Sequence, residues 1–398
     1  MLDVLVVGAG PAGAVAAAVL ARAGARVGLV DRASFPRDKL CGDTVNPGAL
    51  ALLDRLGLAS AAYARGLPVD GMRLTGEGGV VIDGRYPRGL TGRALPRRDL
   101  DWALVQAAIA AGASFESSVV VRRAVLSGAA GGPAVGGAIA AGRGAECALP
   151  ARVTIAADGR RSTIAFGLGL ARHPRRPRRW AIGGYYDGAT SQRRLRDVSG
   201  TSRSALGEMH VRRNGYIGIA PVPDDLTNVC LVRPFAPGDL AIADPATLLR
   251  RALDADPLLR DRFAAARLVA PPTVLGPLAV DVAPARIDGL FLAGDAAGFI
   301  DPMTGDGLRF AIRGGELAAH AALDALEHGW RGVHARLDGQ RAREFAAKWR
   351  FNRTLRALVA SPRAVTAAAA GARIAPSLLR AAIEYAGDCR LAGTLDPA

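Results

Sequence analysis

Cysteine and histidine are both scarce in this chain of 398 residues, which has four cysteines and five histidines. The cysteines, Cys41, Cys147, Cys230 and Cys389, lie far apart and form no C-x-x-C pair. This spacing excludes the usual zinc-binding patterns and argues against a framework of disulfide bonds. The histidines show no metal-ligand spacing either. We therefore expect no bound metal.

Long apolar runs are also missing, although 50% of the residues are hydrophobic. No uninterrupted apolar stretch approaches the roughly 18 to 20 residues that span a bilayer. The chain starts directly in a strand-like stretch, without a separate charged and apolar leader. These features predict a globular cytoplasmic protein, and they leave contact with a membrane surface open.

Lysine is nearly absent, since only two of the 51 basic residues, Lys39 and Lys348, are lysines. The net charge is nevertheless +15. A basic balance of this size usually raises nucleic acid as a partner. Here the excess of arginine accompanies heavy use of alanine and glycine, so we interpret it mainly as a compositional bias and expect no nucleic-acid binding. The positive charge can instead attract an acidic substrate, a carrier-bound substrate or an anionic membrane, and these three partners stay open.

The most informative stretch runs from Leu2 to Asp31 and predicts a strand, a tight turn, a helix and a second strand. A run of apolar residues predicts a first strand that is buried on both faces. Gly8, Gly10 and Gly13 follow in the spacing G-x-G-x-x-G, which allows the turn, the approach of a phosphate and close packing of helix on strand. The second strand ends on Asp31, whose carboxylate can accept hydrogen bonds from a ribose. The stretch therefore predicts a bound dinucleotide.

Two later stretches carry an acid and glycines at the end of a predicted strand. The first ends in Asp158-Gly159, and the second begins at Gly294-Asp295 and continues through Gly305 and Gly307. A carboxylate in this position can hold a ribityl hydroxyl group. The N–H groups of the following helix start can face the electron-rich edge of a reduced flavin ring.

These three stretches, in this order, resemble the flavoproteins of the p-hydroxybenzoate hydroxylase superfamily, and most closely its geranylgeranyl reductase group. The resemblance extends from Leu2 to about Ala319 and implies non-covalently bound FAD. An arginine of the R-x-x-L-D block contacts the cofactor in that family; by spacing it is Arg97, and Arg98 is equally available beside it. The implied cofactor contacts are Gly8, Gly10, Pro11, Ala12, Gly13, Asp31, Arg32, Arg97, Asp158, Gly159, Gly294, Asp295, Pro302, Gly305, Gly307 and Leu308.

The stretch F-P-R-D-K-L-C-G-D, residues 35–43, narrows the resemblance. Geranylgeranyl and menaquinone side-chain reductases carry a closely similar F-P-R-x-K-x-C-G block, which implies that Cys41 lies near the flavin ring. Flavin-dependent halogenases resemble this loop but have G-E-S in place of C-G-D, so halogenation is not expected. We predict that Cys41 is a catalytic residue whose thiol pKa is lowered by Arg37 and Lys39. An inert loop thiol is the alternative.

A second block departs from the reductase pattern. Reductases of polyprenyl chains tend to show Y-x-W-x-F-P, whereas this chain has Gly218 and Ala220 at the Trp and Phe positions. The lost rings leave space beside the flavin for a bulkier or ring-shaped substrate. Tyr216 is retained, and His210 lies two residues after Glu208 on the same face of a predicted strand. We predict Tyr216 and His210 as catalytic residues; a structural pair of Glu208 and His210 is the alternative.

The order of strands and helices predicts an α/β fold with a Rossmann-type FAD-binding lobe, a mainly antiparallel β-sheet substrate lobe and C-terminal helices, similar to p-hydroxybenzoate hydroxylase. We expect a discontinuous FAD-binding domain, a substrate-binding domain of two segments and a helical region. Their bounds are 1–60, 96–171 and 278–330 for the first, 61–95 and 172–277 for the second, and 331–398 for the third.

The C-terminal helices carry apolar residues, Phe345, Trp349 and 355–359, close to three arginines. We expect these helices to cover a hydrophobic opening. Either they rest on an anionic membrane surface, or their apolar residues pack against the flavin lobe. The three arginines are Arg350, Arg353 and Arg356.

Two reactions are consistent with the resemblance. In the first, reduced flavin gives a hydride to a C=C bond of a lipophilic isoprenoid, polyketide or aromatic substrate, free or carrier-bound, and a protein acid completes the addition. In the second, a monooxygenase hydroxylates an aromatic or polyketide ring through a C4a-hydroperoxyflavin. A non-catalytic flavin electron carrier is a third class.

The electron donor stays open. Only one glycine-rich turn is present, so the electrons come either from NAD(P)H bound in a groove of its own or from a reduced carrier protein. The oligomeric state stays open.

Overall fold

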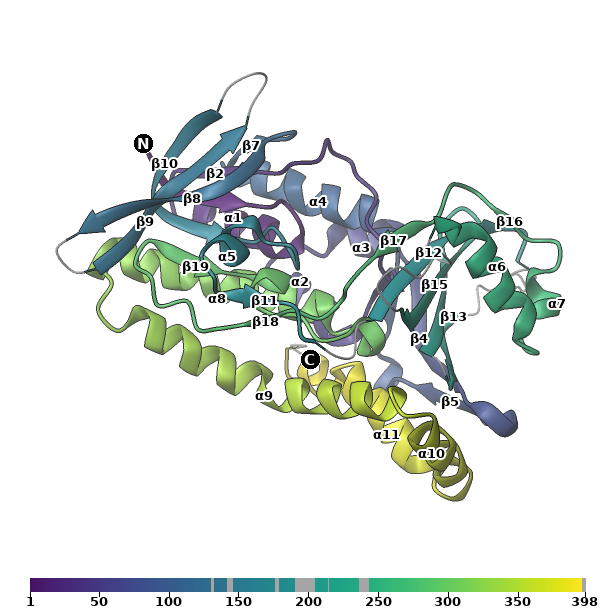
Figure 1. Ribbon diagram of the computed structural model, residues 1–398. Helices are drawn as coiled ribbons and strands as arrows, with labels where there is room; N and C mark the ends of the chain where they lie inside the picture. Colours follow the sequence, from purple (N-terminus) through teal and green to yellow (C-terminus); the bar gives the residue numbers. More distant parts are fainter. Residues whose placement is uncertain are drawn as a thin grey trace.

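Two β-sheets and a run of C-terminal helices build the molecule (Figure 1). The computed structural model describes residues 1–129, 132–141, 146–175, 179–189, 205–213, 215–235 and 243–395. No helix within these ranges has the length and apolar character needed to cross a membrane. No group of three or more His, Cys, Asp or Glu side chains in the described part of the chain could hold a metal ion.

The first sheet carries the glycine-rich turn at the end of its central strand. Its strand order is β7-β2-β1-β10-β9-β8, with β19 paired to β10. The β1–β2, β1–β10, β2–β7 and β10–β19 pairs are parallel, which explains the buried apolar run of β1. The strands are β1 Leu2–Val7, β2 Val27–Val30, β7 Ser114–Glu116, β8 Val120–Ala129, β9 Gly132–Ala141, β10 Glu146–Ala156 and β19 Leu290–Leu292.

Helices α1 and α8 cross closely against this sheet and share its largest apolar core. At the crossing, a Cβ atom on Gly315 would lie 2.2 Å from the carbonyl oxygen of Ala12, so only glycine fits there. The contact fixes the start of α1 relative to α8. The helices of this lobe are α1 Pro11–Arg22, α2 Pro47–Arg55, α3 Ser60–Arg65, α4 Arg97–Ala110, α5 Thr163–Gly167 and α8 Gly307–His328.

The second sheet is mainly antiparallel and has the order β16-β12-β15-β14-β13-β4-β6-β3, with β17 on β12 and β5 on β4. One face packs on α6 (Pro245–Ala255) and α7 (Arg260–Phe263), and the other faces the first lobe and the C-terminal helices. The strands are β3 Thr44–Val45, β4 Leu67–Thr75, β5 Val81–Arg85, β6 Gly92–Ala94, β12 Arg179–Asp187, β13 Ala205–Arg212, β14 Gly215–Val222, β15 Leu226–Pro234, β16 Arg267–Leu268 and β17 Thr273–Leu275. Strands β11 (Ala171–Arg172) and β18 (Asp281–Val282) form a separate pair.

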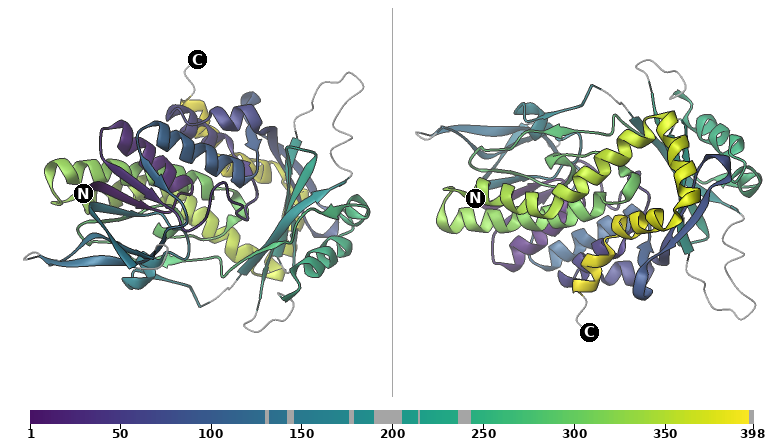
Figure 2. Two further views of the ribbon diagram at one scale, coloured as in Figure 1. Left: turned by 90° about the horizontal axis from the view of Figure 1, so that it is seen from above. Right: turned by 90° about the horizontal axis from the view of Figure 1, so that it is seen from below.

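The C-terminal helices run under the first lobe and reach the second sheet, as the view from below in Figure 2 shows. A buried lysine, Lys348, ties them to the first lobe. Its Nζ lies 3.1 Å from Asp306 Oδ1, 3.2 Å from Asp388 Oδ1 and 3.3 Å from the Ala386 carbonyl oxygen, and it also donates to the Tyr385 carbonyl. The helices are α9 Val333–Val359, α10 Pro362–Ile374, α11 Pro376–Ala386 and α12 Cys389–Leu395.

The apolar residues of α9 that were expected near a membrane or the flavin lobe pack inside the protein. Phe345 is 8% exposed and stacks edge-to-face on Phe310 at 5.1 Å between ring centroids. Trp349 contacts the same ring, and Val359 is buried. Phe345 and Trp349 therefore pack against the first lobe, whereas Val359 packs among apolar residues of the second sheet.

Candidate active site

The glycine-rich turn between β1 and α1 has room for a ligand at one of its three glycines. A Cβ atom on Gly8, which has a φ of +99°, would lie 2.4 Å from the Ala157 carbonyl oxygen, and one on Gly13 would lie 1.8 Å from the Gly8 carbonyl oxygen. At Gly10 the nearest atom is Arg37 Nη2, 3.6 Å away. Helix α1 starts at Pro11 without a side-chain cap, so its dipole and the Arg37 guanidinium face the same open space.

Two of the predicted acids brace the loops around this turn. Asp31 accepts hydrogen bonds from the backbone N–H groups of Ala9 (2.8 Å) and Ala33 (2.9 Å). Asp158 accepts one from Thr163 N at 2.8 Å, while its other carboxylate oxygen is buried without a hydrogen-bond partner. Arg32 is exposed to solvent. The carboxylate of Asp31 retains lone pairs that these bonds do not use, so it can still accept a hydrogen bond from a ribose. That contact stays a prediction.

The segment from Gly294 to Leu308 begins beside the start of α1, where a Cβ atom on Gly294 would lie 2.8 Å from the Ala12 Cβ, and it lines a cavity together with the turn. It contains two short 3₁₀ turns, Gly294–Ala297 and Pro302–Thr304, ahead of α8. Gly305 has a φ of +71°, and a Cβ atom there would meet no atom within 4 Å. The predicted contacts in this segment that line the cavity are Gly294, Asp295, Gly305, Gly307 and Leu308; the side chain of Pro302 lies outside the described part.

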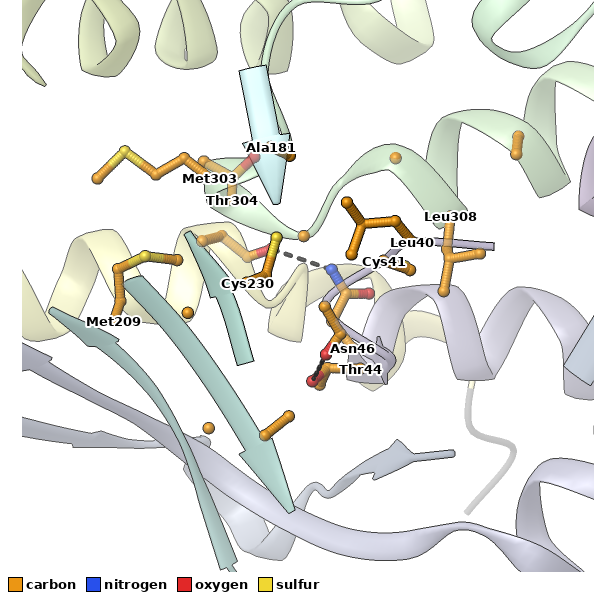
Figure 3. A pocket seen from close by; sticks show the side chains of 18 of the residues that line it. Leu40, Cys41, Thr44, Asn46, Ala181, Met209, Cys230, Met303, Thr304 and Leu308 are labelled. Atoms are coloured by element: carbon orange, nitrogen blue, oxygen red, sulfur yellow. Dashed lines mark hydrogen bonds between the residues drawn. The ribbon is translucent and has the colours of Figure 1, made fainter. Parts of the chain in front are cut away.

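The cavity has a volume of about 300 Å³ and is lined mainly by five parts of the chain. Besides the two cofactor segments, the loop around Cys41 and the face of the second sheet line it. Figure 3 shows Leu40 and Cys41 near Leu308, with Cys230 and Met209 of the second sheet on the other side. Residues of the C-terminal helices complete the wall: Phe351, Leu355, Leu379, Ala382, Ile383 and Ala386. The lining is mostly apolar apart from the cofactor segments.

The arginine at the cavity wall is Arg97 rather than Arg98. Arg97 is 6% exposed, and its Nε and Nη2 donate to the two carboxylate oxygens of Asp101 at 2.7 and 2.8 Å. Arg37 adds a third contact to that carboxylate, at 3.0 Å. Arg98 is exposed and lies 3.4 Å from Asp38. Of the two candidate arginines, Arg97 therefore lines the cavity, and its contact with the cofactor stays a prediction.

Cys41 lies in the cavity wall, but its pKa moves opposite to our expectation. Burial raises the pKa of the thiol, and the opposing effect of the nearby Arg97 is smaller. Burial also lowers the pKa of Lys39, which weakens that residue as a source of positive charge. The prediction of a pKa lowered by Arg37 and Lys39 is therefore wrong. Cys41 is a neutral thiol in this environment, and a neutral thiol can donate a proton.

Asp43 is a buried acid that the sequence analysis did not identify. Its Oδ2 accepts hydrogen bonds from the Tyr185 hydroxyl at 2.6 Å and from Asn228 Nδ2 at 2.5 Å, and its Oδ1 accepts one from Arg97 N at 3.3 Å. Burial outweighs these bonds and raises the pKa of Asp43 to about 7. Asn228 also donates to the Cys41 carbonyl at 2.8 Å, so one network holds Asp43 beside Cys41. The only sequence signal was its place in the C-G-D stretch.

Asp43→Asn should remove a pH-dependent loss of stability. The folded-state pKa of Asp43 is raised, so its contribution is fully present below the unfolded pKa near 4 and is lost as pH rises towards 7. At about 1.4 kcal/mol per pKa unit, the unfolding free energy of wild type should fall by roughly 2 to 3 kcal/mol relative to the variant between pH 5 and pH 7. Urea unfolding of both proteins at several pH values measures this difference. The exposed Asp38→Asn is the control, and parallel wild-type and Asp43→Asn profiles would contradict the assignment.

Tyr216, predicted as catalytic, does not line the cavity. Its hydroxyl donates to Asp301 Oδ1 at 2.6 Å, and Arg179 Nη1 lies 3.0 Å from the other oxygen of the same buried carboxylate. Burial and the adjacent Asp301 carboxylate raise the pKa of Tyr216 well above its usual value. This geometry gives the hydroxyl a buried structural partner outside the cavity lining, so we do not assign Tyr216 a catalytic role.

His210 is also outside the cavity lining and belongs to a buried hydrogen-bonded chain. Its Nδ1 lies 2.8 Å from Thr75 Oγ1, and its Nε2 lies 3.1 Å from Glu208 Oε2. Arg262 of α7 donates to both oxygens of Glu208. Burial acts to raise the pKa of Glu208, but the bonds from His210 and Arg262 outweigh it and hold the pKa at about 2. The structural pair is therefore the arrangement observed, and we withdraw the catalytic role of His210.

Comparisons with known proteins agree with this site. Residues 1–349 match the family model described as an FAD binding domain. The chain is 34% identical to menaquinone reductase of Mycolicibacterium smegmatis over 330 residues, which are 80% of this chain and 75% of that protein. Over 87 residues, 22% of this chain and 21% of the relative, it is 45% identical to 6-methylpretetramide 4-monooxygenase of Streptomyces rimosus.

Among solved structures, a flavin-dependent brominase superposes with a TM-score of 0.79 and 21% sequence identity, over 98% of this chain and 94% of that chain. At this identity the likeness concerns the fold alone. It confirms the predicted α/β architecture with a sheet lobe and C-terminal helices.

Proposed function

Since the chain belongs to the FAD-binding family, as its residues 1–349 show, it is an FAD-dependent oxidoreductase, and we propose that it reduces a carbon–carbon double bond of a lipophilic substrate. The observation that carries this proposal is the position of Cys41. The loop that resembles the reductases lies in the wall of an apolar cavity, between the glycine-rich turn and the second sheet. The relative with 34% identity is likewise named as a reductase.

The residues around the cavity fit FAD. The start of α1 and Arg37 surround the open space at Gly10, which suits a pyrophosphate. We infer that Asp31 holds the adenosine ribose, Asp295 the ribityl chain and the backbone at Gly305 the flavin ring. When bound and reduced, FAD would supply the hydride, which carries both electrons of the reduction. The chain itself supplies binding, orientation and the proton.

Cys41 is the proposed proton donor to the second carbon of the double bond. Burial keeps its thiol protonated, and Arg97 lies close enough to stabilise the thiolate that remains after the transfer. Asp43 then returns a proton to that thiolate, because its pKa near 7 leaves it partly protonated at neutral pH. The hydroxyl of the half-buried Tyr185 donates a hydrogen bond to Asp43 at 2.6 Å and holds this carboxyl group in place. One hydride and one proton then complete the reduced C–C bond.

The walls of the cavity indicate the class of substrate. The second sheet contributes Met209, Gly218 and Cys230, and the C-terminal helices contribute further apolar side chains, including Leu355 and Leu379. These groups suit an isoprenoid or another hydrocarbon-rich molecule. A polyprenyl quinone is the natural first probe, because the relative with 34% identity is named for menaquinone.

The test is an anaerobic single turnover with chemically reduced protein, which makes the identity of the physiological donor, NAD(P)H or a reduced carrier, irrelevant. Flavin reoxidation that requires the quinone would support the proposal if the product stays heavier by two hydrogen atoms after any quinol has been reoxidised in air; a gain of mass that is lost on reoxidation would mean that only the quinone ring was reduced. Reoxidation that requires O₂, with a product heavier by one oxygen atom, would replace it with hydroxylation. No product under either condition would leave an electron carrier. FMN instead of FAD in the denatured protein would contradict the cofactor assignment.

Hydroxylation of a ring is the second candidate, and the small residues of β14 favour it. A Cβ atom on Gly218 would have only Met209 Cε and the Cys230 carbonyl oxygen nearby, both at 3.9 Å. The space that an aromatic residue fills in polyprenyl reductases is therefore free here, next to the cavity. A ring-bearing substrate fits this space better than a linear chain does.

Gly218→Trp should distinguish the two shapes of substrate. The indole would fill the free space, so turnover of a ring-bearing substrate should fall by at least about 10-fold, equivalent to roughly 1.4 kcal/mol of lost binding in the transition state. Turnover of a linear isoprenoid should change by less than about threefold, because this substrate does not occupy the space that the indole fills. Steady-state kinetics with both substrates measure the ratio, and Val81→Trp on the exposed side of β5 is the control. Equal losses for both shapes would show that Gly218 does not set substrate shape.

A further inference from the structure

The turn between α10 and α11 exposes two large aliphatic side chains. Ile374, the last residue of α10, is 85% exposed, and Leu378 in the first turn of α11 is 73% exposed. Apart from Met1, they are the most exposed large apolar side chains in the described part of the chain. We call these two residues the helical tip. Single exposed apolar residues are common, but two adjacent ones at this level of exposure favour an interaction surface.

The base of the same two helices is well packed, so the helical tip is held in place. Val365 of α10 and Ile383 of α11 are buried, at 3% and 7% exposure. Ser361 caps α10 through a hydrogen bond to Ala364 N. Figure 1 shows α10 and α11 at the edge of the molecule, beyond the end of α9. The exposed side chains therefore lie at the junction of two helices whose far ends are packed against the rest of the protein.

The charges around the helical tip are mainly positive. Helices α10 and α11 carry three arginines, Arg363, Arg373 and Arg380, which are all exposed, and a single acid, Glu384. Apolar side chains flanked by arginines are typical of helices that lie in the interface of an anionic bilayer. The net charge of +15 for the whole chain adds a general attraction to an anionic surface.

The helical tip is continuous with the cavity. Leu379, Ala382 and Ile383 of α11 line the cavity wall, directly after the exposed Leu378. A lipophilic molecule that leaves a bilayer at the helical tip would meet this apolar wall first. The link to delivery of substrate rests on the proposed function, whereas binding to the bilayer does not.

We propose that the helical tip, Ile374 and Leu378, docks the protein on an anionic lipid surface. A second copy of this chain fits less well, because a symmetric contact through the same patch would bring the arginines of both copies together. The proposal replaces the earlier expectation for Phe345, Trp349 and Val359, which pack inside.

The test uses the full-length holoprotein and vesicles of phosphatidylcholine with and without phosphatidylglycerol. Wild type should co-sediment with the anionic vesicles, and less so as salt is raised. Ile374→Ser/Leu378→Ser should lower the partition coefficient by at least about 10-fold, because both side chains lose their transfer into the apolar layer. Leu126→Ser/Val269→Ser, with residues 56% and 55% exposed in other parts of the fold, should bind like wild type.

Three outcomes would overturn the proposal. The first is that wild type fails to bind anionic vesicles, and the second is that the helical-tip variant binds them as well as wild type does. The third is that light scattering shows wild type and the control variant as dimers and the helical-tip variant as a monomer. The last would assign the surface to a second copy. FAD content and turnover of a detergent-dispersed substrate should be unchanged in the variant, so a failure of docking and a failure of the proposed reaction are separately visible.

Discussion

Cys41→Ser is expected to keep FAD bound and to leave chemical reduction of the flavin unchanged, while substrate reduction slows by about 10²-fold or more, the usual contribution of a general acid. Serine preserves the size of the side chain, but its hydroxyl gives up a proton far less readily than a thiol. Anaerobic single turnover with a polyprenyl quinone measures the effect directly, because only the step after flavin reduction should change.

Cys230→Ser is the matched control for this experiment. Its thiol also lines the cavity, and burial together with the nearby Cys41 and Asp43 raises its pKa to about 12, but it lies on β15 of the second sheet and not in the loop of residues 35–43 that resembles the reductases. We expect its turnover to remain within about threefold of wild type, well below the usual effect of a lost general acid. Near-normal turnover of Cys41→Ser, with normal FAD content, would remove Cys41 from the catalytic residues and favour hydroxylation.

Gly13→Ala should have the largest effect on cofactor binding. The added Cβ would lie 1.8 Å from the Gly8 carbonyl oxygen, and backbone cannot move aside as a flexible side chain can. Helix α1 must then shift away from β1, which opens the turn that holds the pyrophosphate. We expect FAD occupancy to fall by more than about 10-fold and stability to fall by about 1–3 kcal/mol or more, the cost of overpacking.

Absorbance of the purified protein and thermal unfolding measure the two consequences. Gly167→Ala, where an added Cβ would meet no atom within 4 Å, is the control and should behave like wild type in both. Full FAD occupancy in Gly13→Ala would mean that the turn adapts, and that the close packing of α1 on β1 is not required for binding.

The parts of the molecule that sequence could predict are those built from local pattern. The β1–α1–β2 unit is recognisable because a buried parallel strand, a glycine turn and a helix each leave a pattern within 30 residues. The loop around Cys41 and the position of Arg97 at the cavity also follow from short blocks, read in the light of the family resemblance. In each case the neighbours along the chain are the neighbours in space.

Asp43 could not be predicted in the same way, because its partners come from distant strands. Tyr185 lies 142 residues later in the chain and Asn228 lies 185 residues later. The prediction of a lowered pKa for Cys41 was wrong for a related reason. Sequence shows the charges at Arg37 and Lys39, but it does not show burial, which is the larger effect here. The retained Tyr216 misled us because its partner, Asp301, is 85 residues away.

The two lysines show what the bias towards arginine could not replace. Lys348 places one nitrogen atom among oxygen atoms of four residues: Asp306, Asp388, Tyr385 and Ala386. A compact ammonium fits such a cage, whereas a planar guanidinium spreads its five donors over a wider fork. Lys39, the other lysine of the chain, lies at the cavity wall. In a chain where nearly every cation is arginine, Lys348 therefore marks a position where the geometry of the cation matters as well as its charge.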